Sequence, residues 1–169
     1  PKNIFKPIKE NMLLTSALEK TNEGYALAKI SGIKLCEYYN QKFNRDYTCI
    51  MPTNLYGPND NFDPKSSHVI PGLINKLHNA KVSSKKKVTL WGSGKPLREF
   101  MHVEDLANAV LFLMKISKTR RMPNYLFNIG TRDELSIRNL SAIIKKIVGY
   151  KGKIIFDKFY PDGVKKKLL

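Results

Sequence analysis

The stretch "NEGYALAKISGIKLCEYYNQKFNRDYTCIMPTNLYG", residues 22–57, changes its hydrophobic pattern from helical to strand-like. Its first part carries apolar side chains at the intervals of an amphipathic helix, namely Leu27, Ile30, Ile33, Leu35 and Tyr38. The turn signal "FNRD" predicts that this helix ends near Asn44. Residues 47–51 are apolar and β-branched, which predicts a buried strand that runs into a Pro-, Asn- and Gly-rich loop over residues 52–64.

The rest of the chain repeats this alternation of strand and helix patterns. We predict strands in "KVTLWGSGK", "NYLFNIGT" and "KIIFD". We predict helices in "SSHVIPGLINKLHNAK", with Ser66 or Ser67 as N-cap, over residues 103–116, and in "LSIRNLSAIIKKIVGY", which Gly149 ends. The buried face expected for this last helix consists of Leu135, Leu140, Ile144 and Ile147. Alternating strands and helices indicate an α/β fold with a mostly parallel sheet.

The composition is that of a globular protein. Hydrophobic residues make up 42% of the 169 residues, and no apolar run is long enough to span a bilayer. The N-terminus has no signal-peptide pattern, and the two cysteines, Cys36 and Cys49, have no metal-ligand spacing. We therefore expect free thiols, no metal site and a cytoplasmic protein.

The net charge of +16 indicates an anionic partner or a lysine-rich surface. The lysines are scattered, with short runs only at residues 85–87 and 165–167. A nucleic-acid-binding module would cluster basic and aromatic residues on one surface. We retain that module as an alternative of a different class, but expect neither a nucleic-acid nor a membrane partner.

Tyr25 and Lys29 are the first candidates for chemistry, because residues four apart share one face of a helix. An ammonium beside a phenol favours the phenolate, which suits a group that donates and accepts protons near neutral pH. From the spacing alone, a surface pair on an amphipathic helix remains the alternative.

Several stretches together resemble the extended short-chain dehydrogenase/reductases, the NAD-dependent epimerase/dehydratase family: "YALAK", "MPTNLYGPNDNF", "SSHVIPGL", "LWGSGKPLREFMHVEDLA", "FNIGT" and "PDGVKKKLL". The resemblance implies the C-terminal half of a Rossmann-type doubly wound parallel sheet plus a smaller α/β substrate-binding domain. Residues 1–55 would belong to the dinucleotide-binding domain and residues 56–169 mainly to the substrate domain, with about 99–130 returning to the first. We expect a piece of a longer protein, inactive by itself, because the family's Gly-rich phosphate-binding turn has no match here.

Within that family, the resemblance implies an enzyme that inverts C3 and C5 of a GDP-4-keto-6-deoxymannose and then reduces C4 with NADPH. Tyr25 would donate the proton and Lys29 would hold the ribose hydroxyls. His68, in "SSHVIP", would move protons during inversion, opposite a cysteine that lies outside these residues. Imidazole suits that task because its pKa lies near neutral pH.

The resemblance also implies binding residues. Those for NADP are Tyr25, Lys29, Pro52, Asn54, Leu55 and His68, and those for the GDP-sugar are Lys76, Trp91, Arg98 and Lys167. Lys76 stands where this subgroup often has arginine. His78 and His102 are expected to be structural or solvated, and a homodimer is implied. The nearer alternative is another nucleotide-sugar epimerase or dehydratase of the same family, which would not need His68.

Overall fold

The computed structural model describes residues 7–119, 124–160, 162 and 166–167. These form two compact units, which we treat separately. Unit 1 comprises residues 1–53, 101–132 and 168–169, and unit 2 comprises residues 54–100 and 133–167. In chain order the elements are η1 (Glu10–Met12), η2 (Lys20–Asn22), α1 (Glu23–Phe43), β1 (Cys49–Pro52), β2 (Asn54–Tyr56), α2 (Val69–Val82), β3 (Lys87–Trp91), β4 (Leu97–His102), α3 (Val103–Thr119), β5 (Leu126–Ile129), β6 (Glu134–Ser136), α4 (Ile137–Val148), β7 (Lys153–Asp157) and β8 (Lys166–Lys167).

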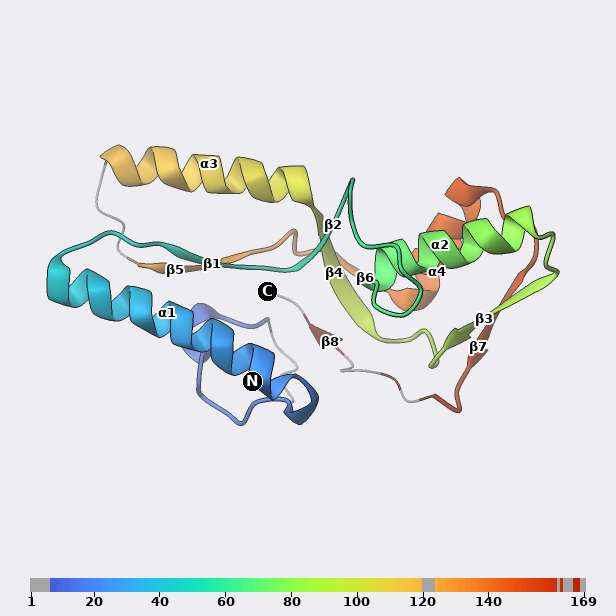
Figure 1. The fold of residues 1–169 in the computed structure, drawn as a ribbon, viewed down its shortest axis with the longest axis horizontal. Helices are drawn as coiled ribbons and strands as arrows, with labels where there is room; N and C mark the ends of the chain where they lie inside the picture. Colours follow the sequence, from blue (N-terminus) through green and yellow to red (C-terminus); the bar gives the residue numbers. More distant parts are fainter. Residues whose placement is uncertain (1–6, 120–123, 161, 163–165, 168–169) are drawn as a thin grey trace. The chain divides into compact units, whose positions relative to one another are not determined.

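Unit 1 is a parallel strand pair between two helices. β1 and β5 pair in register from Cys49 with Leu126 to Pro52 with Ile129. α1 lies over one face of the pair and α3 over the other (Figure 1). This arrangement confirms the predicted helix, which ends at Asn44 in the left-handed region, and the predicted strand that follows it.

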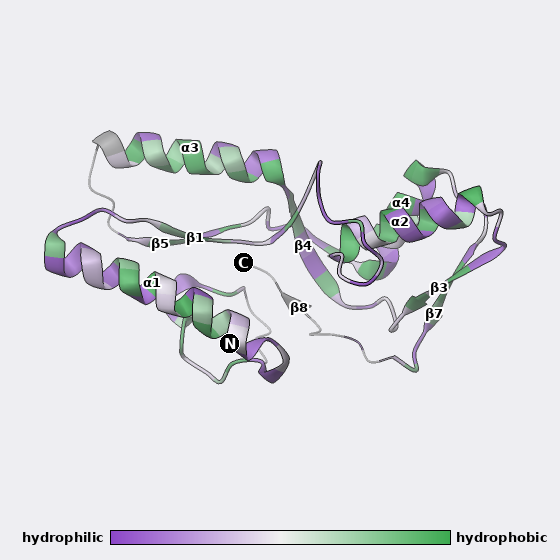
Figure 2. Cartoon of the chain, in the orientation of Figure 1, coloured by the Kyte–Doolittle hydropathy of each residue, from purple (hydrophilic) through white to green (hydrophobic). Residues whose placement is uncertain are grey.

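α1 has two apolar faces, and the sequence predicted only one. Ile30 and Ile33 are half-buried, as expected of residues that face a sheet. Leu27, Leu35 and Tyr38 are at least half exposed, so the apolar face that their spacing predicts is not buried at these positions. The two sets lie on different sides of the helix, and hydrophobic bands along α1 and α3 are visible in Figure 2.

Unit 2 holds the main hydrophobic core. α2 and α4 pack together, and α2 contacts β3, which pairs in parallel with β7. The buried core residues are Ile70, Leu73, Leu77, Ala80, Val88, Leu90, Leu140, Ile144 and Tyr150. Alternate residues of β3 are buried and exposed, so Val88 and Leu90 face the core while Trp91 faces outward.

The sheet formed by β2, β4, β6 and β8 contains both parallel and antiparallel pairings. β4 lies between β2 and β6 and also pairs with β8. The β4–β6 pairing is antiparallel and the β4–β8 pairing is parallel. The predicted α/β class is confirmed, with strands and helices alternating along most of the chain.

Three local predictions need correction. α2 begins one or two residues later than expected, because His68, and not Ser66 or Ser67, occupies its N-cap. Leu135 belongs to β6 and not to the helix that follows. Ile147 is 78% exposed although its i, i+4, i+7 spacing puts it on the same side of α4 as Leu140 and Ile144. It lies in the last turn of the helix, beyond the buried part of that face.

None of the helices in the described part of the chain is long and apolar enough to cross a membrane.

The turn after β3 requires glycine at two positions. Gly92 and Gly94 have φ angles of +80° and +74°, which L side chains rarely adopt. A Cβ on Gly94 would lie 2.5 Å from a ring carbon of Phe156, and one on Gly92 would lie 2.5 Å from Oδ1 of Asp162. Both glycines therefore permit a close approach of the turn to residues near the C-terminus.

Gly94→Ala is expected to lower the free energy of unfolding by at least about 1–2 kcal/mol, since the left-handed conformation alone costs that much. The added methyl would also force the Phe156 ring aside. Gly32→Ala is the matched control, because Gly32 lies within α1 with nothing within 4 Å of its Cβ position. It should raise stability by up to about 1 kcal/mol. Denaturant titration measures both, and equal effects would contradict this account of the turn.

Candidate functional site

Tyr25 and Lys29 lie together at the beginning of α1. Tyr25 is in the first turns of the helix and is 63% exposed. The Lys29 ammonium nitrogen lies 5.6 Å from the centre of the Tyr25 ring. The predicted shared face is therefore present, and the phenol is open to a ligand.

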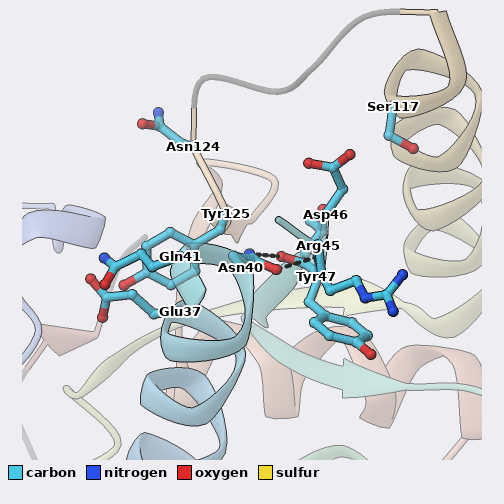
Figure 3. Close-up of a pocket in the computed structure, with 10 residues that line it drawn as sticks. Glu37, Asn40, Gln41, Arg45, Asp46, Tyr47, Ser117, Asn124 and Tyr125 are labelled. Atoms are coloured by element: carbon cyan, nitrogen blue, oxygen red, sulfur yellow. Dashed lines mark hydrogen bonds between the residues drawn. The ribbon is translucent and has the colours of Figure 1, made fainter. Parts of the chain in front are cut away.

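The direction of α1 places Tyr25 near the carboxyl end of β1. The opposite end of the helix contacts the segment just before that strand. The Asn40 side chain donates to the Tyr47 carbonyl and accepts the Tyr47 N–H, each at 2.8 Å (Figure 3). The rings of Tyr39 and Tyr47 also meet there. Tyr25 consequently lies at the end of the parallel pair where ligands bind in open α/β sheets.

A cavity of about 190 Å³ occupies the other end of unit 1 (Figure 3). Its lining residues are Glu37, Asn40, Gln41, Arg45, Asp46, Tyr47, Thr48, Ser117, Asn124 and Tyr125. Because Thr48 and Tyr125 directly precede β1 and β5, the cavity lies at the amino ends of these strands. None of the predicted site residues lines it, and we do not regard it as the ligand site.

The three residues predicted to border the nicotinamide lie at the end of β1 and in β2. Pro52 is the exposed last residue of β1, in unit 1. Asn54 and Leu55 are half-buried residues of β2, in unit 2. The Asn54 amide donates to the Glu99 carbonyl at 2.8 Å, so this side chain ties β2 to β4.

His68 is exposed at the N-cap of α2, and its carbonyl accepts the Gly72 N–H at 2.9 Å. The loop before it is ordered by its own polar side chains. The Ser66 hydroxyl donates to the Asp63 carboxylate at 2.7 Å, which lowers the pKa of Asp63. The backbone of His68 thus ends an ordered loop, and its side chain is exposed.

The other two histidines behave as the sequence predicts. His78 is exposed on α2. Nδ1 of His102 accepts the backbone N–H of Glu104 at 3.3 Å, at the first turn of α3. His102 therefore stabilises the start of a helix.

Lys76 and Trp91 are exposed residues of unit 2. Lys76 lies on α2, and partial shielding of its ammonium from water lowers its pKa. Trp91 is 70% exposed on the outward face of β3, which excludes the core position that its size would otherwise suggest.

Arg98 and Lys167 are paired residues of neighbouring strands. Their backbones lie opposite one another in the parallel β4–β8 pairing. The Arg98 side chain is partly buried and donates to the Leu97 carbonyl at 2.7 Å. Burial lowers the pKa of Arg98, and the nearby Asp162 carboxylate opposes this effect. The Lys167 side chain lies outside the described residues.

Asp162 and Arg138 are residues near this site that sequence reasoning missed. The Asp162 carboxylate accepts the backbone N–H of Ser93 at 2.8 Å and the Ser93 hydroxyl at 2.6 Å. Arg138 donates from Nη2 to the Ser93 carbonyl at 3.0 Å. The turn between Trp91 and Arg98 is thus held from two sides, and the only sequence signal was an Asp-Gly turn in "PDG".

The structure therefore brings the predicted residues together in two groups. The first lies in unit 1, with Tyr25 and Lys29 on one helix and Pro52 at the end of β1. The second lies in unit 2, where Trp91 and Arg98 flank the turn that Asp162 holds. Within the described residues, no three His, Cys, Asp or Glu side chains are grouped to hold a metal ion.

Cys36 and Cys49 are free thiols that contact each other between α1 and β1. Burial, together with the hydrogen bond to Cys36, raises the pKa of Cys49 from its ordinary value of 9.0 to about 11. The unfolded chain loses this proton above about pH 9, whereas the folded chain keeps it until about pH 11.

The contribution of Cys49 to stability is therefore complete below about pH 9 and is lost as the pH rises to about 11. Thermal melts at intervals of pH should show a midpoint that falls across this window. In Cys49→Ala the fall should be shallower there, because the variant has no thiol to titrate. An unchanged pH profile in the variant would contradict the assignment.

The model of the NAD dependent epimerase/dehydratase family matches residues 1–130. The chain belongs to this family. The match includes the helix of Tyr25, the loop of His68 and the strand of Arg98, so these residues lie within the matched part.

Two curated relatives align with the whole chain. GDP-L-fucose synthase of Escherichia coli (strain K12) is 49% identical over 175 residues, which are 100% of this chain and 54% of the relative. GDP-L-colitose synthase of Yersinia pseudotuberculosis is 42% identical, again over 100% of this chain and 54% of the relative. The chain thus spans about half the length of the curated relatives it matches.

A solved relative shows the same fold. A GDP-L-fucose synthetase from Naegleria fowleri, bound to NADP, superimposes with a TM-score of 0.88 at 32% sequence identity. The match covers 99% of this chain and 53% of that one. This relative, solved with NADP bound, therefore shares the fold of the chain.

Proposed function

We propose that this chain supplies the Tyr/Lys helix and the nucleotide-sugar-binding unit of a GDP-L-fucose synthase. That enzyme converts GDP-4-keto-6-deoxymannose to GDP-L-fucose with NADPH. One observation carries the proposal. Tyr25 and Lys29 share the ligand end of α1, in a chain whose 169 residues all align with the E. coli synthase at 49% identity.

For the reduction, NADPH supplies the hydride that C4 receives. Tyr25 donates the proton to the C4 oxygen, since its hydroxyl is exposed at the carboxyl end of β1. Lys29, one turn away, holds the ribose hydroxyls. Pro52, Asn54 and Leu55 border the nicotinamide.

For the inversion at C3 and C5, each carbon must lose a proton on one face and gain one on the other. Both positions are α to the ketone, so each proton can leave as an enolate forms. His68 supplies one of the two proton carriers, because its imidazole is exposed at the end of a loop that Ser66 and Asp63 order. The partner cysteine implied by the resemblance lies outside this chain.

The proposed NADP-binding residues are divided between the units, with Tyr25, Lys29 and Pro52 in unit 1 and Asn54, Leu55 and His68 in unit 2. The proposed GDP-sugar ligands, Lys76, Trp91, Arg98 and Lys167, all belong to unit 2. The exposed indole and the guanidinium beside the held turn support this assignment of the GDP-sugar, since a guanidinium suits diphosphate oxygens. The bound NADP of the Naegleria relative supports the choice of cofactor.

We also propose a cytoplasmic homodimer. α1 and α3 expose large apolar side chains, namely Leu27, Leu35, Tyr38, Phe43, Leu111, Phe112 and Met114. A second copy would cover such faces. Light scattering that reports a folded monomer at micromolar concentration would reject the dimer.

A chimera tests the function directly. Residues 1–169 replace the aligned segment of the E. coli synthase, and NADPH consumption is followed with GDP-4-keto-6-deoxymannose as substrate. The proposal predicts GDP-L-fucose as product, at a rate within about tenfold of the E. coli parent. A folded chimera that binds NADPH but does not consume it with this substrate would overturn the proposal.

A further inference from the structure

Trp91 and Tyr160 form a stacked aromatic pair on the surface of unit 2. Their ring centres are 4.6 Å apart and the ring planes differ by only 16°. Trp91 is 70% exposed and Tyr160 is 40% exposed. Trp91 ends β3 and Tyr160 follows β7, so two parallel neighbouring strands deliver the rings to one place.

Hydrogen bonds join the segments that carry the two rings. Asp162, two residues after Tyr160, bonds both the N–H and the hydroxyl of Ser93, two residues after Trp91. Arg138 holds the Ser93 carbonyl from the other side. The Phe159 ring meets the Tyr160 ring edge-on, with ring centres 6.0 Å apart.

Two cations lie near Asp162, the residue that holds the turn after Trp91. Both Lys95 and Arg98 interact electrostatically with the Asp162 carboxylate, which Ser93 already engages. Flat aromatic faces stack on nucleobases, and guanidinium groups bind phosphate oxygens in a bidentate manner. A nucleoside diphosphate presents both features, joined by one ribose.

We propose that Tyr160, together with Trp91, forms the platform on which the nucleobase of the GDP-sugar stacks. The inference rests on the proposed function, to which it adds Tyr160 as a binding residue. The base stacks on the exposed ring surface of the pair, and the diphosphate extends toward Arg98. Tyr160 acts through its ring, so its hydroxyl is not needed for stacking.

The test measures affinity for GDP and for inorganic pyrophosphate. Trp91 is the single tryptophan of the chain, so quenching of its fluorescence reports a base on the platform. Tyr160→Ala should weaken GDP binding roughly 5- to 100-fold, from the effect of removing one stacking ring. Tyr160→Phe should bind GDP within about twofold of the affinity of the unsubstituted chain, because the phenyl ring still stacks.

Pyrophosphate separates stacking from a structural effect. Tyr160→Ala should leave the pyrophosphate affinity unchanged, whereas Arg98→Gln should weaken both ligands. Ile147→Ala, a change at an exposed residue in the last turn of α4, controls for loss of surface apolar area. Calorimetry with the chimera repeats the comparison in a chain of the relatives' length.

The outcomes are distinguishable. Equal GDP affinity in the parent and in Tyr160→Ala would overturn the role of Tyr160 while the proposed function stands. Equal weakening of GDP and pyrophosphate would show that Tyr160 only supports the turn, which also overturns the inference. A folded parent chimera that binds neither ligand would reject the proposed function itself.

Discussion

In the chimera, Tyr25→Phe is expected to slow reduction of the 4-keto sugar about 100- to 10,000-fold, the usual contribution of a general acid. The affinity for the GDP-sugar should change by less than about twofold, because the ring and its packing remain. The hydroxyl is needed only as the C4 oxygen gains charge, so the loss appears in kcat and not in the binding constant. Stopped-flow NADPH oxidation measures the first quantity and calorimetry the second.

Tyr38→Phe is a closely matched control on the same helix. Lys42 follows Tyr38 by four residues, and its ammonium lies 5.4 Å from the ring centre, nearly as in the Tyr25 pair. Tyr38 is 50% exposed but lies toward the other end of α1. Turnover of Tyr38→Phe should equal that of the parent. Turnover of Tyr25→Phe within a few-fold of the parent would show that Tyr25 is not the proton donor.

The second large effect is expected at His68. In the chimera, His68→Asn should block inversion at C3 and C5 about 100-fold or more, while the ketone remains reducible. Asparagine keeps the approximate size and one hydrogen bond but cannot carry protons at neutral pH. The product should shift from GDP-L-fucose toward 6-deoxy sugars that keep their original configuration, which NMR of the product identifies.

His78→Asn serves as the control for this change. His78 lies on α2, the helix whose N-cap is His68. It is also exposed, but it has no predicted role in the reaction. Its product should be normal. If His68→Asn also gave normal GDP-L-fucose at the parent rate, His68 would be a capping residue and the inversion would need another proton carrier.

Much of the fold could be predicted from the sequence because it depends on local patterns. The end of α1 at Asn44, the strand before the Gly-Ser-Gly turn and the helix after His102 follow from hydrophobic periodicity and turn residues. The exposure of Leu35 and Ile147 could not be predicted, since periodicity shows that a residue is apolar without showing what covers it.

The site was predictable only where one element carries it. The Tyr25–Lys29 pair lies on one helix, so spacing alone places the two side chains together. Asp162 and Ser93 are 69 residues apart, and Tyr160, which follows β7, stacks on Trp91 at the end of β3. Such contacts depend on the β3–β7 register, which no local pattern specifies.

The most direct test of the central claim is deuterium uptake by the chimera during turnover in heavy water with NADPH. A GDP-L-fucose synthase must exchange the protons at C3 and C5 before it reduces C4. We expect deuterium at both carbons of the fucosyl product, detected by NMR and mass spectrometry. NADPH consumption with a product that carries no deuterium at C3 or C5 would contradict it, because these residues would then serve only a 4-reductase.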